Sequence, residues 1–454
     1  MKVSLILCGA LLFSFTSYAA VPRKELISYT LDYYASGGKI EEVDQDAEAR
    51  VQKQEQDKTI ETQAEERNAA EGKEIKKEGA VGIEGEEIKK EGKWSNRVKV
   101  FLKNVHPYAK VKAQYDDNVY LIRSDEVEDF VTTIDAGLLL QSKLSKNKIQ
   151  VFLDGGEEIT RYASQTKNNI SHPYARGLMN WNLGKVGLAF TGGVDKNHTP
   201  ASLAEDIEEK VFITNWVYNY GSSFKFNLRR FESELQYNHR GYSYIGEENT
   251  PSNNNRDILA IRNSFKIFSK TKVFLEYAHG WLDYFKDKDS SLNYDRYWIG
   301  LDGTFLRKLS GEVKYGYVAS NPKIGKHQHG SNMSMKLNYK PSRRLGFYTE
   351  VFKGFGDSGL MNDTINKTRG VRLGASYLPL SNRRLRLQTS VSYKEQDLDP
   401  DLRNKYFTFN FIPEYKLTKW LSAGLNYQYS ERKSSDKLIE YIDNSVALTL
   451  NSEF

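Results

Sequence analysis

Two pairs of side chains have the residue types and spacing that catalysis or metal binding requires. Asp195 and His198 lie three positions apart and could form an acid–base dyad, while His327 and His329 flank Gln328, where two imidazoles could hold a metal loosely. No carboxylate is placed beside the two histidines, and an aspartate–histidine pair on a polar loop is usually only solvated. We therefore expect no catalytic residue, no metal site and no cofactor.

A larger set of charged residues alternates with apolar ones along the chain. Arg384 and Arg386 alternate with Leu385 and Leu387. The set carries both signs, which suits a wet interior whose charges solvate the space or line a path for a polar solute. The candidate lumen residues are Glu232, Glu234, Arg240, Arg372, Arg384, Arg386 and Glu414, and we expect Phe352 or Trp298 to be able to stack on sugar rings.

Period-two alternation predicts the elements that position these charges. It starts near Val105 and is clearest in residues 384–393, 231–240, 333–339 and 421–430. Strict alternation of this length indicates strands with one apolar face. We predict strands at 107–116, 130–141, 148–158, 172–182, 185–195, 210–226, 230–244, 256–268, 271–285, 292–307, 310–319, 330–340, 344–355, 369–379, 383–395, 404–417, 420–430 and 441–454.

Three features favour a membrane barrel over a water-soluble sandwich. The strands are long enough to cross a bilayer when tilted, and aromatic residues gather toward the ends of their apolar faces. Tight turns such as 142–145 alternate with long polar loops such as 246–255 and 321–330. We predict an all-β, antiparallel transmembrane β-barrel of about eighteen strands, with sixteen also acceptable, over residues 105–454.

The N-terminus indicates export. Lys2 precedes an apolar run from Val3 to Phe15, and Ser17 and Ala19 occupy the small-residue positions of a cleavage site, so residues 1–19 are predicted to be a signal peptide. The single cysteine, Cys8, lies within it, so the mature chain has no thiol or disulfide chemistry. The formal charge of +6 is small against 65 basic and 59 acidic residues, and neither this balance nor export favours a nucleic-acid partner.

Residues 20–104 form a different region. They are rich in charge, contain almost no aromatic clusters and repeat Glu-Ile-Lys-Lys-Glu-Gly at residues 74–79 and 87–92. We expect a charged N-terminal extension, helical or disordered, in the periplasm. It is too short and too poor in apolar residues to form a barrel plug, which argues against a plugged siderophore transporter.

The last strand carries the most specific motif. Val446, Leu448, Leu450 and Phe454 fall on alternate positions counted back from the carboxyl end, although Ser452 interrupts the apolar series. A closing strand that ends in phenylalanine resembles the insertion signal that the barrel-assembly machinery recognises. We expect these four residues to serve that role, with the outer-membrane lipid and lipopolysaccharide as surroundings.

The first strand carries a second motif, Tyr115-Asp116-Asp117-Asn118-Val119-Tyr120. With the strand count and the C-terminus, it resembles a family of β-barrel porins often found with exopolysaccharide or capsule export systems. The resemblance covers roughly residues 105–454 and implies an eighteen-stranded, porin-like barrel that passes polysaccharide.

We therefore expect a non-enzymatic, porin-like conduit in the outer membrane of a Gram-negative bacterium, with both termini periplasmic. The expected solute is polar or a carbohydrate, and the extension could contact a periplasmic export component. The alternative is a structural or adhesion barrel with a closed lumen and ligand-binding extracellular loops. An open lumen would carry a stepwise conductance, whereas a sealed barrel would be silent.

Overall fold

The computed structural model describes residues 104–144, 148–200, 212–246, 253–286, 291–324, 327–357, 365–380, 384–399 and 402–453. The predicted signal peptide, the charged extension except for Asn104, and the terminal Phe454 lie outside this range. In the described part of the chain, no helix is long and apolar enough to cross a membrane.

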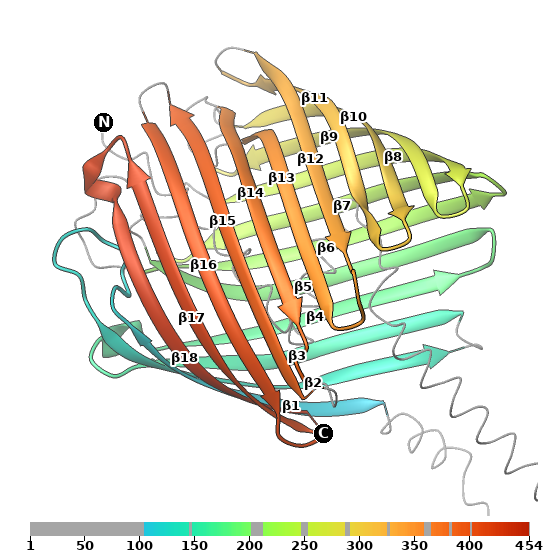
Figure 1. Cartoon of the computed structure of the whole chain (residues 1–454). Helices are drawn as coiled ribbons and strands as arrows, with labels where there is room; N and C mark the ends of the chain where they lie inside the picture. The colour runs from blue at the N-terminus through green and yellow to red at the C-terminus, as the bar shows by residue number, and fades with distance from the viewer. Residues whose placement is uncertain are drawn as a thin grey trace, which may run out of the picture. The chain divides into compact units, whose positions relative to one another are not determined.

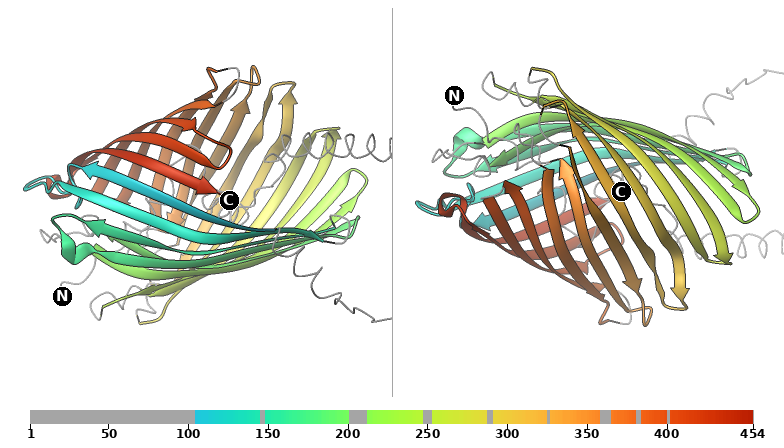
Figure 2. Two further views of the ribbon diagram at one scale, coloured as in Figure 1. Left: turned by 90° about the horizontal axis from the view of Figure 1, so that it is seen from below. Right: turned by 90° about the horizontal axis from the view of Figure 1, so that it is seen from above.

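Eighteen antiparallel strands form one closed sheet (Figures 1 and 2). Each strand pairs with its neighbours in the sequence, and β1 also pairs with β18, from Tyr108 opposite Glu453 to Asp116 opposite Ser445. The strands are β1 Val105–Asp116, β2 Asp129–Leu144, β3 Ile149–Tyr162, β4 Ile170–Asn182, β5 Val186–Pro200, β6 Phe212–Leu228, β7 Phe231–Tyr244, β8 Asn254–Phe268, β9 Thr271–Tyr284, β10 Leu292–Leu306, β11 Leu309–Pro322, β12 Gln328–Tyr339, β13 Leu345–Asp357, β14 Ile365–Tyr377, β15 Leu385–Asp399, β16 Leu402–Lys416, β17 Leu421–Ser434 and β18 Tyr441–Glu453.

The predicted fold class is confirmed, including the strand number and the closed, antiparallel arrangement. Among the connections that the structure describes, two contain a short 3-10 helix, Thr166–Asn168 and Lys437–Ile439. The short turns follow the even-numbered strands, and we call that end of the barrel the short-turn end. We call the opposite end, where odd-numbered strands connect to even-numbered ones, the long-loop end.

Some predicted boundaries were wrong at the long-loop end. The predicted loop at 396–403 is only residues 400–401, because β15 and β16 continue to pair as far as Asp399 and Leu402, with a register irregularity at 397–399. The predicted loop at 321–330 shrinks to 323–327 for the same reason. Hydrogen bonding between neighbouring strands continues beyond the alternating segments, and the apolar period alone does not reveal this.

The outward face of the sheet is apolar. Leu138, Leu275, Ile299 and Leu448 are more than half exposed, at 57, 61, 54 and 63 %. Exposed tyrosines lie side by side toward the long-loop end, as with Tyr277, Tyr297 and Tyr317, and another exposed aromatic pair, Tyr339 and Phe347, stacks near the short-turn end. Large exposed apolar side chains bounded by aromatic residues match a lipid-facing surface.

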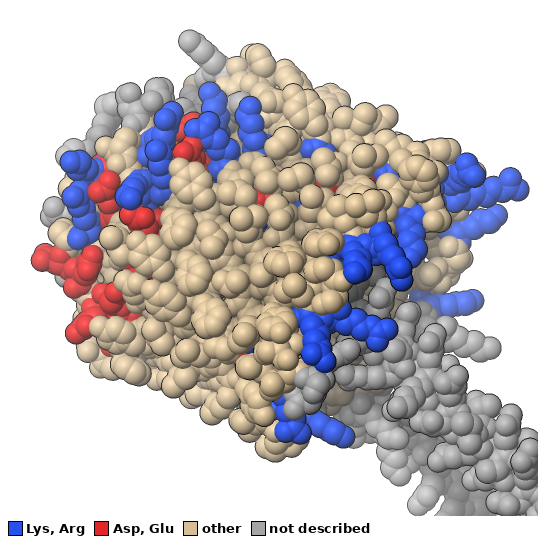
Figure 3. Space-filling view, in the orientation of Figure 1, with Lys and Arg blue, Asp and Glu red and all other residues tan. Residues whose placement is uncertain are grey.

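The two ends differ in charge. Every short turn contains lysine or arginine, and none contains aspartate or glutamate; the turns are 145–148, 183–185, 229–230, 269–270, 307–308, 340–344, 378–384 and 417–420. Figure 3 shows basic residues along the right edge of the face in view and both signs along the left edge, with an uncharged band between them. Acidic residues occur only in connections at the long-loop end, as in 117–128, 201–211 and 245–253.

Candidate functional site

The candidate site is the inward face of the barrel, which the strand alternation fills with polar side chains. On β7 the inward positions include Glu232, Glu234 and Gln236, which are 4, 7 and 6 % exposed, whereas Phe231 and Leu235 on the outward face are 42 and 45 % exposed. Since successive strand residues point to opposite faces, one period-two pattern produces both surfaces.

A group of paired charges crosses six neighbouring strands on this inward face. We call it the ionic ladder. Glu232 on β7 accepts ion pairs from Lys225 on β6 at 3.2 Å and from Lys272 on β9 at 2.8 Å. Arg262 on β8 joins Glu276 on β9 at 2.5 Å and Glu312 on β11 at 2.9 Å, and Lys314 contacts Glu312 at 3.3 Å. Five of its members are 14 % exposed or less, so pairing offsets the cost of removing their charges from water.

A glycine allows Arg262 to reach Glu312 across two intervening strands. The Phe274 ring lies over Gly300 on β10, where a Cβ would come within 2.5 Å of the ring. The Arg262 guanidinium lies 4.1 Å from the centroid of this ring and continues to Glu312. The Phe274 ring, which lies against Gly300, thus supports the arginine through a cation–π contact.

A second, smaller charge group centres on Glu350 of β13. It binds Arg372 of β14 at 3.0 Å and Lys336 of β12 at 3.6 Å, and the Tyr348 hydroxyl donates to it at 3.0 Å. Arg372 was predicted from sequence, whereas Glu350 and Lys336 were not. Their signal was available, because both occupy the polar face of alternating strands.

The remaining predicted lumen residues lie elsewhere on the wall. Arg386 of β15 and Glu414 of β16 are direct partners in the strand register near the short-turn end. Arg240 of β7 lies opposite Arg256 of β8 in the long-loop half. Arg384 lies before the first residue of β15, in the short-turn end, and its side chain is exposed. The structure therefore places these four residues at three positions on the wall, separate from the ionic ladder and from the Glu350 group.

Inward aromatic side chains lie against the wall instead of pointing freely across the interior. Trp298 packs over Gly316, with Lys314 4.9 Å from its ring, and Phe352 packs over Gly370. Cations also lie over Tyr294 and Tyr406, contributed by Arg296 at 4.4 Å and Lys394 at 4.2 Å. The inner wall therefore presents both cations and aromatic surface to the lumen.

A hydrogen-bonded network that the sequence analysis missed links β1 to β5. The hydroxyl of Tyr108 donates to Asp154 at 2.7 Å, that of Tyr174 donates to Asp135 at 2.7 Å, and the two hydroxyls contact each other. Arg176 pairs with Asp195 at 2.6 Å in the same region. These residues come from five strands, so no local spacing identifies the network.

The two pairs considered for catalysis and metal binding are separated by their partners. Asp195 binds Arg176, whereas the His198 ring stacks on Phe212 at 4.5 Å and its Nδ1 contacts the Thr214 hydroxyl at 2.8 Å. His327 contacts Asn321 at 2.8 Å, and the His329 ring lies 6.0 Å from that of Tyr317. Neither arrangement forms the dyad or the imidazole pair that the sequence spacing suggested.

The predicted insertion residues lie on the outward face of β18. Val446, Leu448 and Leu450 are 40, 63 and 51 % exposed and lie opposite Tyr115, Ala113 and Val111 of β1. Phe454 lies outside the described residues. The three described residues therefore contribute apolar surface at the junction that closes the barrel.

Comparisons with known proteins agree with this architecture. A family model described as "Putative beta-barrel porin 2" matches residues 101–454. No curated protein matches the sequence.

Three solved structures illustrate the structural matches. OpdK from Pseudomonas aeruginosa, solved with vanillate, has 10 % identity over 78 % of this chain and 100 % of its own, with a TM-score of 0.45. OpdL from the same organism has 13 % identity over 77 and 98 %, with a TM-score of 0.44. The siderophore receptor PirA from Acinetobacter baumannii has 8 % identity over 77 and 80 %, with a TM-score of 0.42.

Proposed function

The chain belongs to the Putative beta-barrel porin 2 family, and from this premise we propose that its barrel conducts polar solutes, acidic carbohydrates in particular, across the outer membrane. The observation that carries the proposal is the inward wall of cations placed over aromatic rings. Lys314 over Trp298 and Arg296 over Tyr294 combine a positive charge with a flat apolar surface. Acidic sugars offer the complementary carboxylate and ring faces.

The paired charges suit a wet passage. Carboxylates and cations alternate along the ionic ladder, so a moving solute can exchange one charged partner for the next without a large change in solvation. The same pairing limits the affinity of any single wall position for the solute, so the solute can leave a position as well as enter it.

The proposed orientation places the short-turn end in the periplasm. The first described residues and Glu453 lie at this end, because β1 starts and β18 finishes there. The basic short turns would contact the acidic phospholipid headgroups of the inner leaflet. The charged extension would then enter the periplasm, where it could contact an export component, and β18 would carry the signal for the assembly machinery.

Single-channel recording tests the conduit. The full-length protein in a planar bilayer should give stepwise conductance, and an oligomer of uronic acids should interrupt the current more often than a neutral glucan of equal length. Lys314→Gln should reduce these interruptions severalfold, because it removes a cation from the wall, whereas Lys323→Gln serves as an exposed control. Absence of conductance would instead support the sealed structural barrel, and equal interruption by both sugars would remove the acidic preference.

A further inference from the structure

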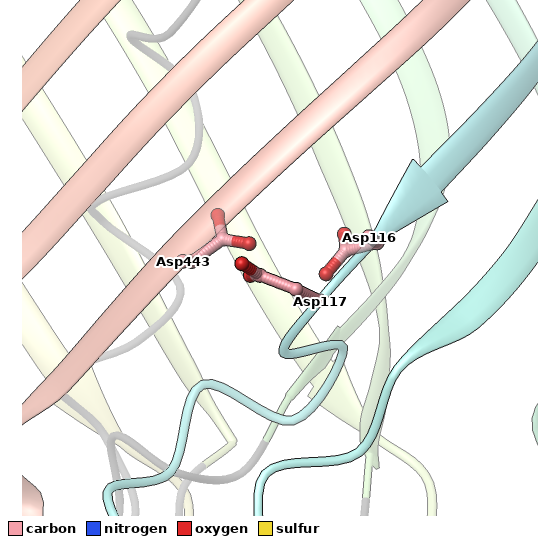
Figure 4. A group of neighbouring side chains, drawn as sticks. All are labelled: Asp116, Asp117 and Asp443. Carbon is pink, nitrogen blue, oxygen red and sulfur yellow. The ribbon is translucent and has the colours of Figure 1, made fainter.

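Three carboxylates meet where the first and last strands close the barrel, at the long-loop end. Asp116 ends β1, Asp117 begins the following connection, and Asp443 belongs to β18. One oxygen from each lies within 4.8 Å of the other two. Figure 4 shows the three side chains converging from the two sides of this junction, which we call the acidic seam.

Amide groups hold two of these carboxylates in place. Asp117 accepts hydrogen bonds from the backbone N–H of Asn444 at 2.6 Å and from its side-chain amide at 2.9 Å. Asp116 accepts from the backbone N–H of Asn118 at 3.1 Å and from the Gln114 side chain at 2.8 Å. These donors fix the direction of both carboxylates but bring no positive charge.

Asp443 is the independent observation that points to a ligand. Its side chain belongs to a residue only 4 % exposed, it is aimed at the other two carboxylates, and its Oδ1 atom has no hydrogen-bond partner. Among the described residues, no lysine, arginine or histidine lies within ion-pair distance of any of the three. A buried carboxylate oxygen without a donor is costly, so a missing positive partner is expected.

We propose that the acidic seam binds a Ca²⁺ ion. The donor set consists of oxygen alone, which suits a hard cation, and Ca²⁺ binds oxygen at about 2.3–2.6 Å. Two ligands on opposite sides of the ion are then separated by about 4.6–5.2 Å and neighbouring ligands by less, so three oxygens that all lie within 4.8 Å of one another fit one Ca²⁺ coordination sphere. Mg²⁺ usually keeps several waters and is bound through one or two carboxylates, so a set of three carboxylates suits Ca²⁺ better.

The ion would lock the barrel closure. Asn118, the residue after the two aspartates, is completely buried, and its side-chain amide donates to the carbonyl oxygens of Ile122 at 2.7 Å and Ile442 at 2.8 Å. The connection after β1 is thus already fastened to β18. A cation shared by Asp116, Asp117 and Asp443 would add a bond between the same two segments and offset the repulsion of their charges.

Calcium binding by the refolded full-length protein tests this inference. In detergent without lipopolysaccharide, we expect one Ca²⁺ per chain by isothermal titration, with a dissociation constant of about 10⁻⁴–10⁻³ M. Chelation should lower the midpoint of thermal unfolding, Ca²⁺ should restore it, and Mg²⁺ should restore it less. Asp443→Asn, which keeps the size of the side chain, should abolish both responses.

A matched control is Asp283→Asn, because Asp283 is an exposed carboxylate at the same end of the barrel. It should keep the calcium response. The site is refuted if the wild-type protein binds no Ca²⁺ at concentrations about tenfold above the expected dissociation constant. It is also refuted if the Asp443→Asn variant binds Ca²⁺ as well as the wild type does. A proton shared between the carboxylates would give the first of these results. Ca²⁺ binding is measured without any conductance, so this test is independent of the proposed transport.

Discussion

The ionic ladder and the acidic seam both contain buried carboxylates, Glu232 in the ladder and Asp443 in the seam, but the charges of the two groups are neutralised differently. In the ladder, Glu232 has two lysine partners, and Glu276 and Glu312 share Arg262. In the seam, three carboxylates lie together with amide donors and no cationic side chain among the described residues. A buried charge needs a partner, so one region supplies it internally and the other is built to obtain it from outside.

The difference has a consequence for assembly. Long cationic side chains can span two or three strands inside the ladder, as Arg262 does between β8 and β11. The seam joins strands from opposite ends of the chain, which meet only when the barrel closes. A partner that arrives from solution can bind after closure, when all three ligands are present.

Removing the central cation of the ladder should have the largest effect. Arg262→Met leaves Glu276 and Glu312 buried with reduced pairing, and we expect a loss of about 3–5 kcal/mol in the free energy of unfolding. Urea unfolding in detergent measures it. Lys323→Gln, at an exposed pair with Asp283 3.8 Å long, should change stability by about 0–1 kcal/mol. Equal effects of the two variants would show that the ladder is not a buried network.

The same carboxyl-to-amide change should affect the free energy of unfolding differently in the two regions. Glu232→Gln leaves Lys225 and Lys272 without their carboxylate, so it should destabilise by about 2–3 kcal/mol. Asp443→Asn, measured in chelator, should leave stability unchanged or raised, because it removes one of three like charges. Destabilisation by both variants would remove the distinction between ladder and seam.

Adding one methyl group at Gly300 should show whether the Phe274 ring supports Arg262 in the ladder. Gly300→Ala places a Cβ 2.5 Å from the Phe274 ring and 2.7 Å from the carbonyl oxygen of Val313, so the ring must move from beneath Arg262. We expect a loss of about 1–2 kcal/mol in urea unfolding. Gly354→Ala is the matched control, since no atom lies within 4 Å of its added Cβ. An unaffected Gly300→Ala variant would show that the ring is free to reposition.

The pattern of apolar residues predicted most of the fold. Alternation from Val105 onward was enough to place eighteen strands, because a strand with one face toward lipid and the other toward the interior has a two-residue apolar period. It did not predict how far hairpins extend past the apolar band, as β15 and β16 illustrate, since hydrogen bonds between backbones are independent of side-chain pattern. Arg384 lies one residue before β15, at the edge of the pairing, where its carbonyl oxygen accepts a hydrogen bond from the Lys416 N–H at 2.8 Å.

By itself, the sequence determined which residues face each side of the wall, because the strand period is a local property of the backbone. It also contained the Asp116-Asp117-Asn118 motif as a recognisable feature. Only the tertiary structure brought Asp443 to that motif, Arg262 to Glu312 and Tyr108 to Asp154. Those contacts depend on strand register and on closure between β1 and β18, and a register is set by pairing across the whole sheet rather than by neighbouring residues.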